Sequence, residues 1–361
     1  MTSGVSSSAG PYRVMVVDDS AVIRGLVARA LEVDADIKVV ASVADGQMAV
    51  NSLAKSDAEV VVLDIEMPVM NGLEALPKLL AINPHVKIIV SSTLTLENAE
   101  VSFRALELGA ADYIPKPDTK KLHAAVDFKR ELTSKVKVYG ALARSLMSGG
   151  GSRGGSQPKQ ATAARPVPAA RPEIIAIGSS TGGPQALFSV LASLKDVPVP
   201  IVITQHMPPR FTTILAQHIT SQAGVPCTEA RSGDKLEAGK AFLAPGDYHM
   251  TFEGVPGSVR VVLNQEAPEN FCRPAVDPML RSLAAIYGKR VVVAILTGMG
   301  NDGMKGAQSI ADAGGTIVAQ DEATSIVWGM PAAVAKAGLA DAIMSLNTIG
   351  PWLREQVMQV H

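Results

Sequence analysis

Cysteine is scarce in this chain of 361 residues, which contains only Cys227 and Cys272. Two cysteines in a chain of this length build no disulfide framework, and they do not form a CxxC metal-binding motif. This excludes the disulfide-rich secreted class and favours a reducing compartment. We therefore expect a cytoplasmic protein.

Long hydrophobic runs are missing as well. The longest apolar runs, such as 291–296, are far shorter than the roughly 20 residues that a membrane helix needs. Residues 1–10 are rich in Ser and Gly and lack the basic start and apolar core of a secretory signal. The sequence therefore predicts a soluble protein without membrane insertion.

Neither sign of charge dominates, because 33 Lys and Arg residues stand against 34 Asp and Glu residues, for a net charge of −1. No global field would draw such a chain onto nucleic acid or an anionic membrane, so a nucleic-acid partner is not expected. Hydrophobic residues make up 47% and charged residues 19%, which is typical of a folded globular protein. The length fits two domains of ordinary size.

One shift in composition divides the chain. Residues 148–172 are rich in Gly, Pro and Ala and contain no acidic residue, so they cannot bury enough apolar surface to offset the entropy of ordering. We place a disordered N-terminus at 1–11, a first domain at 12–135, a flexible linker at 136–172 and a second domain at 173–361.

Short apolar runs alternate with helical patterns on both sides of the linker. In the first domain we expect strands at 13–17, 38–43, 60–63, 87–90 and 112–115. In the second domain we expect them at 173–177, 200–204, 241–244, 260–263, 290–296 and 316–319. This alternation predicts the α/β class with two doubly wound parallel sheets, the first flavodoxin-like and the second Rossmann-like. The stretches 249–252 and 259–263 are typical of a small antiparallel hairpin.

Acidic side chains follow two strands of the first domain. Asp18 and Asp19 come after the first strand and Asp64 after the third, and the carboxyl ends of parallel strands meet at one edge of a sheet. Three carboxylates close together repel unless a cation lies among them, and Mg²⁺ prefers oxygen ligands. The fourth and fifth strands lead to Ser91 and Lys116, which add a hydroxyl and an ammonium group. The set predicts a phosphoryl-binding site with Mg²⁺.

The Asp18-Asp19 pair, the run DIEMPVMNG that begins at Asp64, and Lys116-Pro117 make residues 12–130 resemble a response-regulator receiver domain. The resemblance implies that Asp64 accepts a phosphoryl group from a chemotaxis histidine kinase. It also implies that Asp19 and Asp64 hold Mg²⁺ together with the backbone carbonyl of Glu66, with Asp18 assisting.

The same resemblance implies how the receiver responds to the phosphoryl group. Ser91 would be the switch hydroxyl, with Thr93 as a weaker alternative, and Tyr113 would be the switch aromatic residue. Lys116 would pair with the phosphate. A cis peptide bond is expected between Lys116 and Pro117.

A strand, a tight turn and a helix open the second domain. The strand leads into Gly178-Ser179-Ser180-Thr181-Gly182, which matches G-x-S-x-G, and Pro184 suits the first turn of the helix. The Ser180 hydroxyl would lie beside a helix N-terminus, whose N–H groups favour negative charge. The same turn could equally cradle a nucleotide phosphate, so this motif alone leaves both readings open.

Two further strand ends favour a nucleophile. His206 follows the next strand, where an imidazole can act as a base, and Asp302 follows the later strand 290–296. Ser180, His206 and Asp302 make a plausible triad in which His206 takes the Ser180 proton and Asp302 stabilises the imidazolium. Backbone N–H groups of the Gly-rich turns would stabilise an oxyanion. The chain order Ser, His, Asp differs from that of α/β-hydrolases, so that fold is not predicted.

Four segments carry a second resemblance, which covers about 173–355: they are 177–183 (IGSSTGG), 204–209 (TQHMPP), 244–247 (APGD) and 296–303 (LTGMGNDG). They resemble the catalytic domain of the CheB family of chemotaxis protein-glutamate methylesterases. The resemblance implies that Ser180 is the nucleophile, His206 the base and Asp302 the orienting acid. The backbone N–H groups of Met299 and Thr181 would be oxyanion donors.

The second resemblance also implies a reaction. The substrate would be the γ-methyl ester of glutamate on methyl-accepting chemoreceptors, hydrolysed to glutamate and methanol without a cofactor, and particular receptor glutamines would be deamidated. Two positions depart from the family pattern. Ser179 stands where Ala is frequent, which makes it the next candidate nucleophile, and Ala275 stands where Ser is common, which affects contacts in the substrate groove.

Together these features predict a phosphorylation-activated serine hydrolase that gives adaptation in chemotaxis-type signalling. The unphosphorylated receiver would cover the cleft, and phosphorylation of Asp64 would expose Ser180. The alternative is a non-enzymatic adaptor that binds receptors or the kinase, which the complete triad disfavours. A DNA-binding regulator is disfavoured because 173–361 carries more acidic than basic residues and no basic helix-turn-helix. A monomer is expected.

Overall fold

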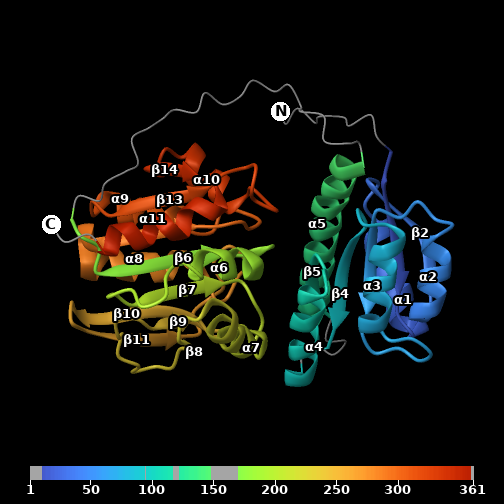
Figure 1. Cartoon of the computed structure of the whole chain (residues 1–361), viewed down its shortest axis with the longest axis horizontal. Helices are drawn as coiled ribbons and strands as arrows, with labels where there is room; N and C mark the ends of the chain where they lie inside the picture. The colour runs from blue at the N-terminus through green and yellow to red at the C-terminus, as the bar shows by residue number, and fades with distance from the viewer. Residues whose placement is uncertain (1–9, 94, 117–121, 148–169, 359–361) are drawn as a thin grey trace. The chain divides into compact units, whose positions relative to one another are not determined.

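The chain folds into two compact units that divide near residue 155 (Figure 1). The computed structural model describes residues 10–93, 95–116, 122–147 and 170–358. Within these ranges no helix combines the length and the apolar character needed to cross a bilayer. Each unit has its own parallel sheet, so the expected α/β class is confirmed.

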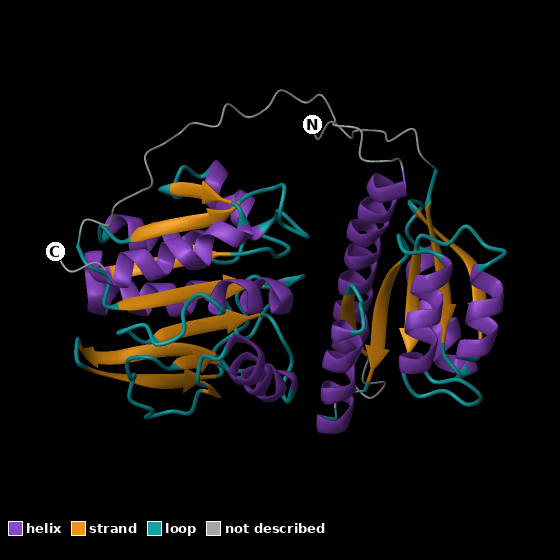
Figure 2. Cartoon of the chain, viewed as in Figure 1, coloured by secondary structure: helices purple, strands orange, loops and turns teal. Residues whose placement is uncertain are grey.

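The first domain is a five-stranded parallel sheet in the order β2-β1-β3-β4-β5, with helices on both faces (Figure 2). This is the flavodoxin-like order. Its strands are β1 (Tyr12–Val17), β2 (Ile37–Val43), β3 (Val60–Asp64), β4 (Lys87–Ser92) and β5 (Asp112–Pro115). Its helices are α1 (Ala21–Glu32), α2 (Gly46–Leu53), α3 (Gly72–Ile82), α4 (Leu96–Glu107) and α5 (Leu122–Met147).

Alternating side chains along β1 supply both faces of this sheet with a core. Val14 and Val16 belong to a buried cluster that includes residues of α1 and α5. Met15 and Val17 are equally buried and point to the opposite face, because successive strand residues alternate. Strands buried on both faces are typical of parallel sheets covered by helices.

Helix α5 is longer than the sequence analysis expected. It continues to Met147, so residues 136–147, which we had placed in the linker, are helical. Val136, Tyr139 and Ala143 are buried in this stretch. The apolar spacing of the helix therefore continues past 135. The composition shift at 148 predicts the end of the helix more accurately than the boundary at 135. The rest of the predicted linker up to 169, and residues 1–9, lie outside the described residues.

The last turns of α5 are tied to the sheet by a buried ion pair. Arg144 donates to the Glu59 carboxylate from Nε at 2.5 Å and from Nη2 at 3.0 Å, and its guanidinium lies 4.2 Å from the centre of the Tyr12 ring. Glu59 is almost fully buried, so its charge depends on Arg144 and on Arg13.

The second domain is a seven-stranded parallel sheet in the order β14-β13-β12-β6-β7-β9-β8, beside the predicted antiparallel hairpin of β10 and β11. Its strands are β6 (Ile174–Ser179), β7 (Ile201–Gln205), β8 (Cys227–Glu229), β9 (Ala241–Leu243), β10 (His249–Val255), β11 (Ser258–Asn264), β12 (Val291–Ile295), β13 (Thr316–Gln320) and β14 (Ala342–Met344). Its helices are α6 (Gly183–Leu191), α7 (Phe211–His218), α8 (Val276–Tyr287), α9 (Met304–Asp312), α10 (Met330–Lys336) and α11 (Leu346–Met358). The sequence analysis missed the short strands β8 and β14.

The strand order reverses at β6. The chain continues from β6 to β7, β9 and β8 on one side, and β12, β13 and β14 lie on the other. In open parallel sheets the crevice beyond the carboxyl ends of the strands at such a reversal is where ligands bind. The carboxyl ends of β6, β7 and β12 therefore position the candidate site of this domain.

We predict that a receiver fragment ending at residue 135 is less stable than one ending at 147. Truncation removes the buried Val136 and Tyr139 and leaves the buried Glu59 charge without Arg144, so the free energy of unfolding should fall by at least about 3 kcal/mol. Urea unfolding of fragments 10–135 and 10–147 measures the difference. Lys137→Ala, which removes the surface ion pairs with Asp34 and Asp36, should cost about 1 kcal/mol or less. Equal stability of the two fragments would show that the helix end contributes nothing.

Candidate functional site

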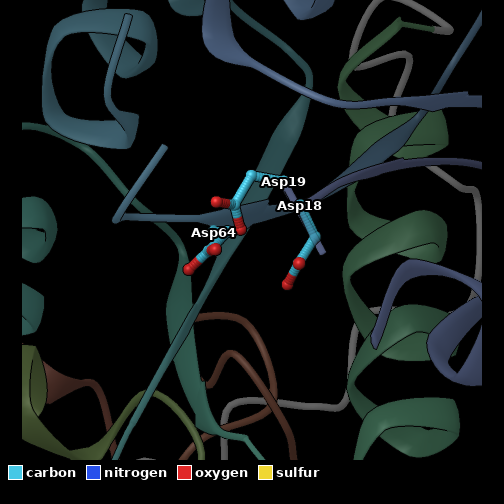
Figure 3. Close-up of side chains that lie close together, drawn as sticks. All are labelled: Asp18, Asp19 and Asp64. Carbon is cyan, nitrogen blue, oxygen red and sulfur yellow. The ribbon is translucent and has the colours of Figure 1, made fainter. Parts of the chain in front are cut away.

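The acidic pocket of the first domain lies at the carboxyl ends of β1 and β3 (Figure 3). Asp18, Asp19 and Asp64 each bring one carboxylate oxygen within 4.8 Å of the others. Asp18 and Asp64 are buried, whereas Asp19 is exposed. The prediction that these three carboxylates meet is confirmed. The Glu66 side chain is exposed, and the role predicted for that residue concerns its backbone carbonyl.

A cation and a hydroxyl complete this pocket. Lys116 Nζ lies 2.8 Å from Asp18 Oδ2 and 2.7 Å from Asp64 Oδ2. Ser91 pairs in register with Asp64, and its buried hydroxyl has no hydrogen-bond partner among the described residues. A buried hydroxyl without a partner, on the residue that pairs with Asp64, fits the oxygens of an incoming phosphoryl group.

The remaining candidates for the receiver switch, Tyr113 and Thr93, differ in how far they are buried. Tyr113 is buried on β5. Thr93 is exposed and accepts a hydrogen bond from the Asn98 side chain, so it is less available than Ser91. The expected cis bond before Pro117 lies outside the described residues.

The electrostatics of the acidic pocket favour a bound cation. Burial, helped by the charge of Asp18, raises the pKa of Asp64 to about 6, although Lys116 acts in the opposite direction. Burial opposes the charge of Lys116, but its ion pairs with Asp18 and Asp64 outweigh this and raise its pKa. One ammonium group therefore does not fully compensate the crowded carboxylates. Three close oxygen donors of this kind fit Mg²⁺.

Ser180 and Ser179 occupy different environments at the end of β6. The Ser180 amide donates to the Thr297 carbonyl at 3.0 Å, and its own carbonyl accepts from Gln205 Nε2 at 2.9 Å, while its side chain is half-buried. Ser179 is fully buried, and its hydroxyl donates to Gln205 Oε1 at 2.6 Å. The Ser179 hydroxyl is thus used within the fold, and the Ser180 hydroxyl is the one near the surface.

Glycine lets the end of β12 approach this turn. A Cβ at Gly298 would lie 2.8 Å from Ser180 Cβ and 2.4 Å from Met330 Sδ. Among the described residues, the backbone amides of Thr181 and Met299 donate no hydrogen bond. Neither amide is therefore used by another group in the described part of the chain.

His206 lies one residue beyond β7, at the strand end next to Ser180. In the β6–β7 ladder Ser179 pairs with Gln205, so Ser180 and His206 follow at matched positions. His206 Nε2 lies 2.7 Å from Asp302 Oδ2, and Nδ1 lies 3.3 Å from Cys272 Sγ. The structure therefore joins His206 and Asp302 directly and places Ser180 at the neighbouring strand end.

The Asp302 carboxylate is held at the start of α8. Oδ2 accepts a hydrogen bond from the Val276 amide at 2.6 Å, and Oδ1 accepts from the Asp277 amide at 3.2 Å and from Asn270 Nδ2 at 3.0 Å. The N-cap residue of α8, Ala275, has no side chain that could satisfy these amides. Asp302 thus caps α8 from another part of the chain.

These contacts set opposite charges on the His206–Asp302 pair. Burial alone would raise the pKa of Asp302, but the hydrogen bonds from His206 and from the start of α8 lower it to about 2. Burial alone would lower the pKa of His206, but Cys272 and Asp302, one at each ring nitrogen, raise it well above 6.5. Asp302 is therefore an ionised partner that favours a protonated imidazole.

Sequence reasoning missed four residues that shape this site: Gln205, Asn270, Cys272 and Asp277. Gln205 carried a weak signal, because it is a polar residue in the last position of a buried strand. The other three come from the segment between β11 and the first turn of α8, where no strand end or periodic pattern marks them.

Fold and geometry together define a class of protein: a response regulator whose second domain carries a Ser, His and Asp set of the hydrolase type. The family model for "Response regulator receiver domain" matches residues 14–127, and the model for "CheB methylesterase" matches 175–353. The chain belongs to the CheB family of protein-glutamate methylesterases/protein-glutamine glutaminases, as its relatives show.

Two curated relatives match almost the whole chain. The protein-glutamate methylesterase/protein-glutamine glutaminase of group 2 operon from Rhodospirillum centenum is 54% identical over 98% of this chain and 96% of its own length. The protein-glutamate methylesterase/protein-glutamine glutaminase of Azospirillum brasilense is 55% identical over 97% of this chain and 94% of its own. The crystal structure of the CheB methylesterase catalytic domain from Thermotoga maritima is similar at 41% identity and a TM-score of 0.50, over 52% of this chain and all of that one.

We predict that the His206 imidazole titrates with a midpoint above 6.5 in the folded protein. Asp302→Asn and Cys272→Ala should each lower the midpoint, because each removes a group that favours the protonated ring. NMR titration of the ring, with His206→Gln used to assign the resonance, measures these values. A wild-type midpoint at or below 6.5 would contradict the prediction.

Proposed function

We propose that this chain hydrolyses glutamate γ-methyl esters on chemoreceptors to glutamate and methanol, and that it deamidates particular receptor glutamines. The observation that carries the proposal is the partly buried His206–Asp302 hydrogen bond at the strand end next to the half-buried Ser180. The two relatives, each named for both activities, support it.

In the proposed reaction Ser180 attacks the ester carbonyl and His206 accepts its proton. Because Nε2 donates to Asp302, Nδ1 is the nitrogen left to receive that proton, and the Cys272 thiol beside it must give way to Ser180. Asp302 stabilises the imidazolium that forms. As the tetrahedral intermediate collapses, His206 protonates the departing methoxide oxygen, which leaves as methanol. His206 then takes a proton from the water that attacks the acyl-enzyme and returns it to Ser180 as glutamate is released. A glutamine side chain follows the same route with ammonia as the leaving group.

The substrate oxygen gains negative charge in the tetrahedral intermediate. The available backbone amides of Thr181 and Met299, in the turns after β6 and β12, are the proposed donors to it. Fixed amides of this kind need no reorganisation when the charge develops, which is why an oxyanion hole lowers the barrier.

The first domain would make this activity responsive to a histidine kinase of the chemotaxis type, through phosphorylation of Asp64. Asp19, Asp64 and the Glu66 carbonyl would hold Mg²⁺ with help from Asp18, and the ion would offset the charge of the phosphoryl group. Asp64 would then carry the phosphoryl group next to the ammonium group of Lys116.

Two side chains would report the phosphorylated state. The Ser91 hydroxyl, which has no partner among the described residues, would donate to a phosphoryl oxygen. Tyr113, on the neighbouring strand, would change its position when Ser91 moves. In the resting chain the receiver would cover the cleft of the second domain, and phosphorylation would uncover it.

We predict that Ser180→Ala lowers methanol release from methylated receptor membranes by at least about 1,000-fold, because it removes the nucleophile. Ser179→Ala is the matched control. It should keep most of the activity and lose about 1–3 kcal/mol of stability, because it leaves Gln205 Oε1 buried without its donor. The opposite pattern, with activity lost only in Ser179→Ala, would mean that the nucleophile is Ser179.

We predict that acetyl phosphate with Mg²⁺ raises the methylesterase rate of the full chain and that Asp64→Asn abolishes this response. Removal of Mg²⁺ with EDTA should abolish it too, since the crowded carboxylates and the phosphoryl group need a cation. The matched control is Asp57→Asn, which changes an exposed carboxylate before β3 and should respond like wild type. A response that survives in Asp64→Asn would refute the assignment of the phosphorylation site.

A further inference from the structure

A strained turn lies between the hairpin and α8 and contacts both members of the His206–Asp302 pair. The amides and carbonyls of Glu269 and Cys272 bond to each other, at 2.8 and 3.1 Å, across Asn270 and Phe271. Both central residues have left-handed backbone angles, φ 51° at Asn270 and 65° at Phe271. Turns of this geometry favour Asn followed by Gly, so a Phe in the second position must be held there by contacts elsewhere.

The Asn270 side chain supplies such a contact. Its Nδ2 donates to Asp302 Oδ1 at 3.0 Å and to Asp277 Oδ2 at 3.0 Å, so one amide group bridges two buried carboxylates. The bond to Asp302 is on Oδ1, whereas His206 binds Oδ2. Asn270 therefore fixes the carboxylate from the side opposite the imidazole.

The two carboxyl groups also accept hydrogen bonds from the first turns of two helices, α8 and α9. Asp302, just before α9, accepts from the first amides of α8, and Asp277, in α8, accepts from the Gly306 amide of α9 at 2.7 Å. The N-cap residues of both helices, Ala275 and Gly303, make no side-chain cap. The two carboxyl groups lie close together in the interior, and burial together with the charge of Asp302 raises the pKa of Asp277. A donor between them lowers the cost of burying them.

Several other ionisable groups lie around the carboxylate pair. His206 and Cys272 contact each other, Glu269 and Arg281 form a partly exposed ion pair, and His249 accepts a hydrogen bond from the Ala275 amide just before α8. None of these groups is hydrogen-bonded to both carboxylates within the described part of the chain. Among the described residues, only the Asn270 side chain donates hydrogen bonds to both Asp302 and Asp277.

We propose that Asn270 is a positioning residue, whose amide orients the Asp302 carboxylate toward His206 and bridges it to Asp277. The proposal rests on the proposed role of the His206–Asp302 pair in ester hydrolysis. Asn270 reaches neither the substrate ester nor Ser180 in this role. It acts through Asp302, by fixing the ring tautomer in which Nε2 carries the proton and Nδ1 can accept one from Ser180 once the Cys272 thiol has moved aside.

The main test compares Asn270→Gly with Phe271→Gly in the full chain. Glycine keeps the left-handed backbone in both variants, and only Asn270→Gly removes the bridging amide. We expect kcat for methanol release to fall about 10- to 100-fold in Asn270→Gly, as for loss of a hydrogen bond to a charged group, with KM within about 2-fold. Phe271→Gly should keep kcat within about 3-fold. An equal fall in both variants would show that only the turn matters and would overturn the proposal.

A second variant separates positioning from a purely structural role. Asp tolerates the left-handed backbone nearly as well as Asn, so a role confined to the backbone of the turn would survive Asn270→Asp. A positioning role would not, because a third carboxylate would then face Asp302 and Asp277 without a donor. We expect Asn270→Asp to be at least as impaired as Asn270→Gly, and near wild-type activity would refute the proposal.

The ¹⁵N shifts of the His206 ring provide a readout that needs no substrate. In neutral wild-type rings we expect Nε2 to carry the proton, and in Asn270→Gly we expect a mixture of tautomers, with Phe271→Gly unchanged. A single Nε2–H tautomer in Asn270→Gly would overturn the proposal even if activity fell. If the proposed function were wrong, wild type would release no methanol, while the tautomer comparison would still decide the role of Asn270.

Discussion

The second domain depends on keeping one negative charge, that of Asp302, in the protein interior. Hydrogen bonds from His206, from Asn270 and from the first amides of α8 stabilise this charge, and the N-terminus of a helix adds a favourable dipole. The result is a pKa of about 2 for a nearly fully buried carboxyl group. A carboxylate that stays ionised at any physiological pH can stabilise an imidazolium throughout a reaction cycle. The end of β12, the start of α8 and the 269–272 turn must all be in place for this to hold.

The first domain uses buried carboxylates in the opposite way. Asp64 has Lys116 as its cation but Asp18 as a close neighbour of like charge, and burial raises its pKa to about 6. Its charge is therefore only partly compensated by the protein, in contrast to that of Asp302. Such a pocket is stabilised by reversibly bound groups, namely a divalent cation and a phosphoryl group. Aspartate thus provides a permanently ionised group in the second domain and part of a site for exchangeable ligands in the first.

The limits of sequence reasoning follow from how each residue reaches its place. Asp18, Asp64, His206 and Asp302 follow strongly patterned strands, and parallel topology alone brings strand ends together. Asn270 reaches Asp302 only because two consecutive residues adopt left-handed angles, which no pattern in the segment signals. The strands β8 and β14 have three residues each, too few to show a periodicity, and they form by pairing with β9 and β13. Residues 136–147 were misplaced because their helical spacing was not followed past 135, although the composition shift begins only at 148.

The G-x-S-x-G turn shows why a local motif and a fold are separate inferences. In this chain the first serine of the pair, Ser179, donates a hydrogen bond to Gln205, and a Cβ at Gly183 would clash with Gln205 Oε1. Position 183 must therefore be glycine, because the Gln205 side chain on β7 leaves no room for a Cβ. Gln205 also donates a hydrogen bond to the Ser180 carbonyl at 2.9 Å. The turn thus depends on the β6–β7 pairing, which also sets His206 next to Ser180. The motif matches that of the α/β-hydrolases because a sharp strand-to-helix turn with an exposed Ser imposes similar residues. The order Ser, His, Asp reflects the reversal of strand order at β6, since the chain forms β7 on one side of β6 before it forms β12 on the other.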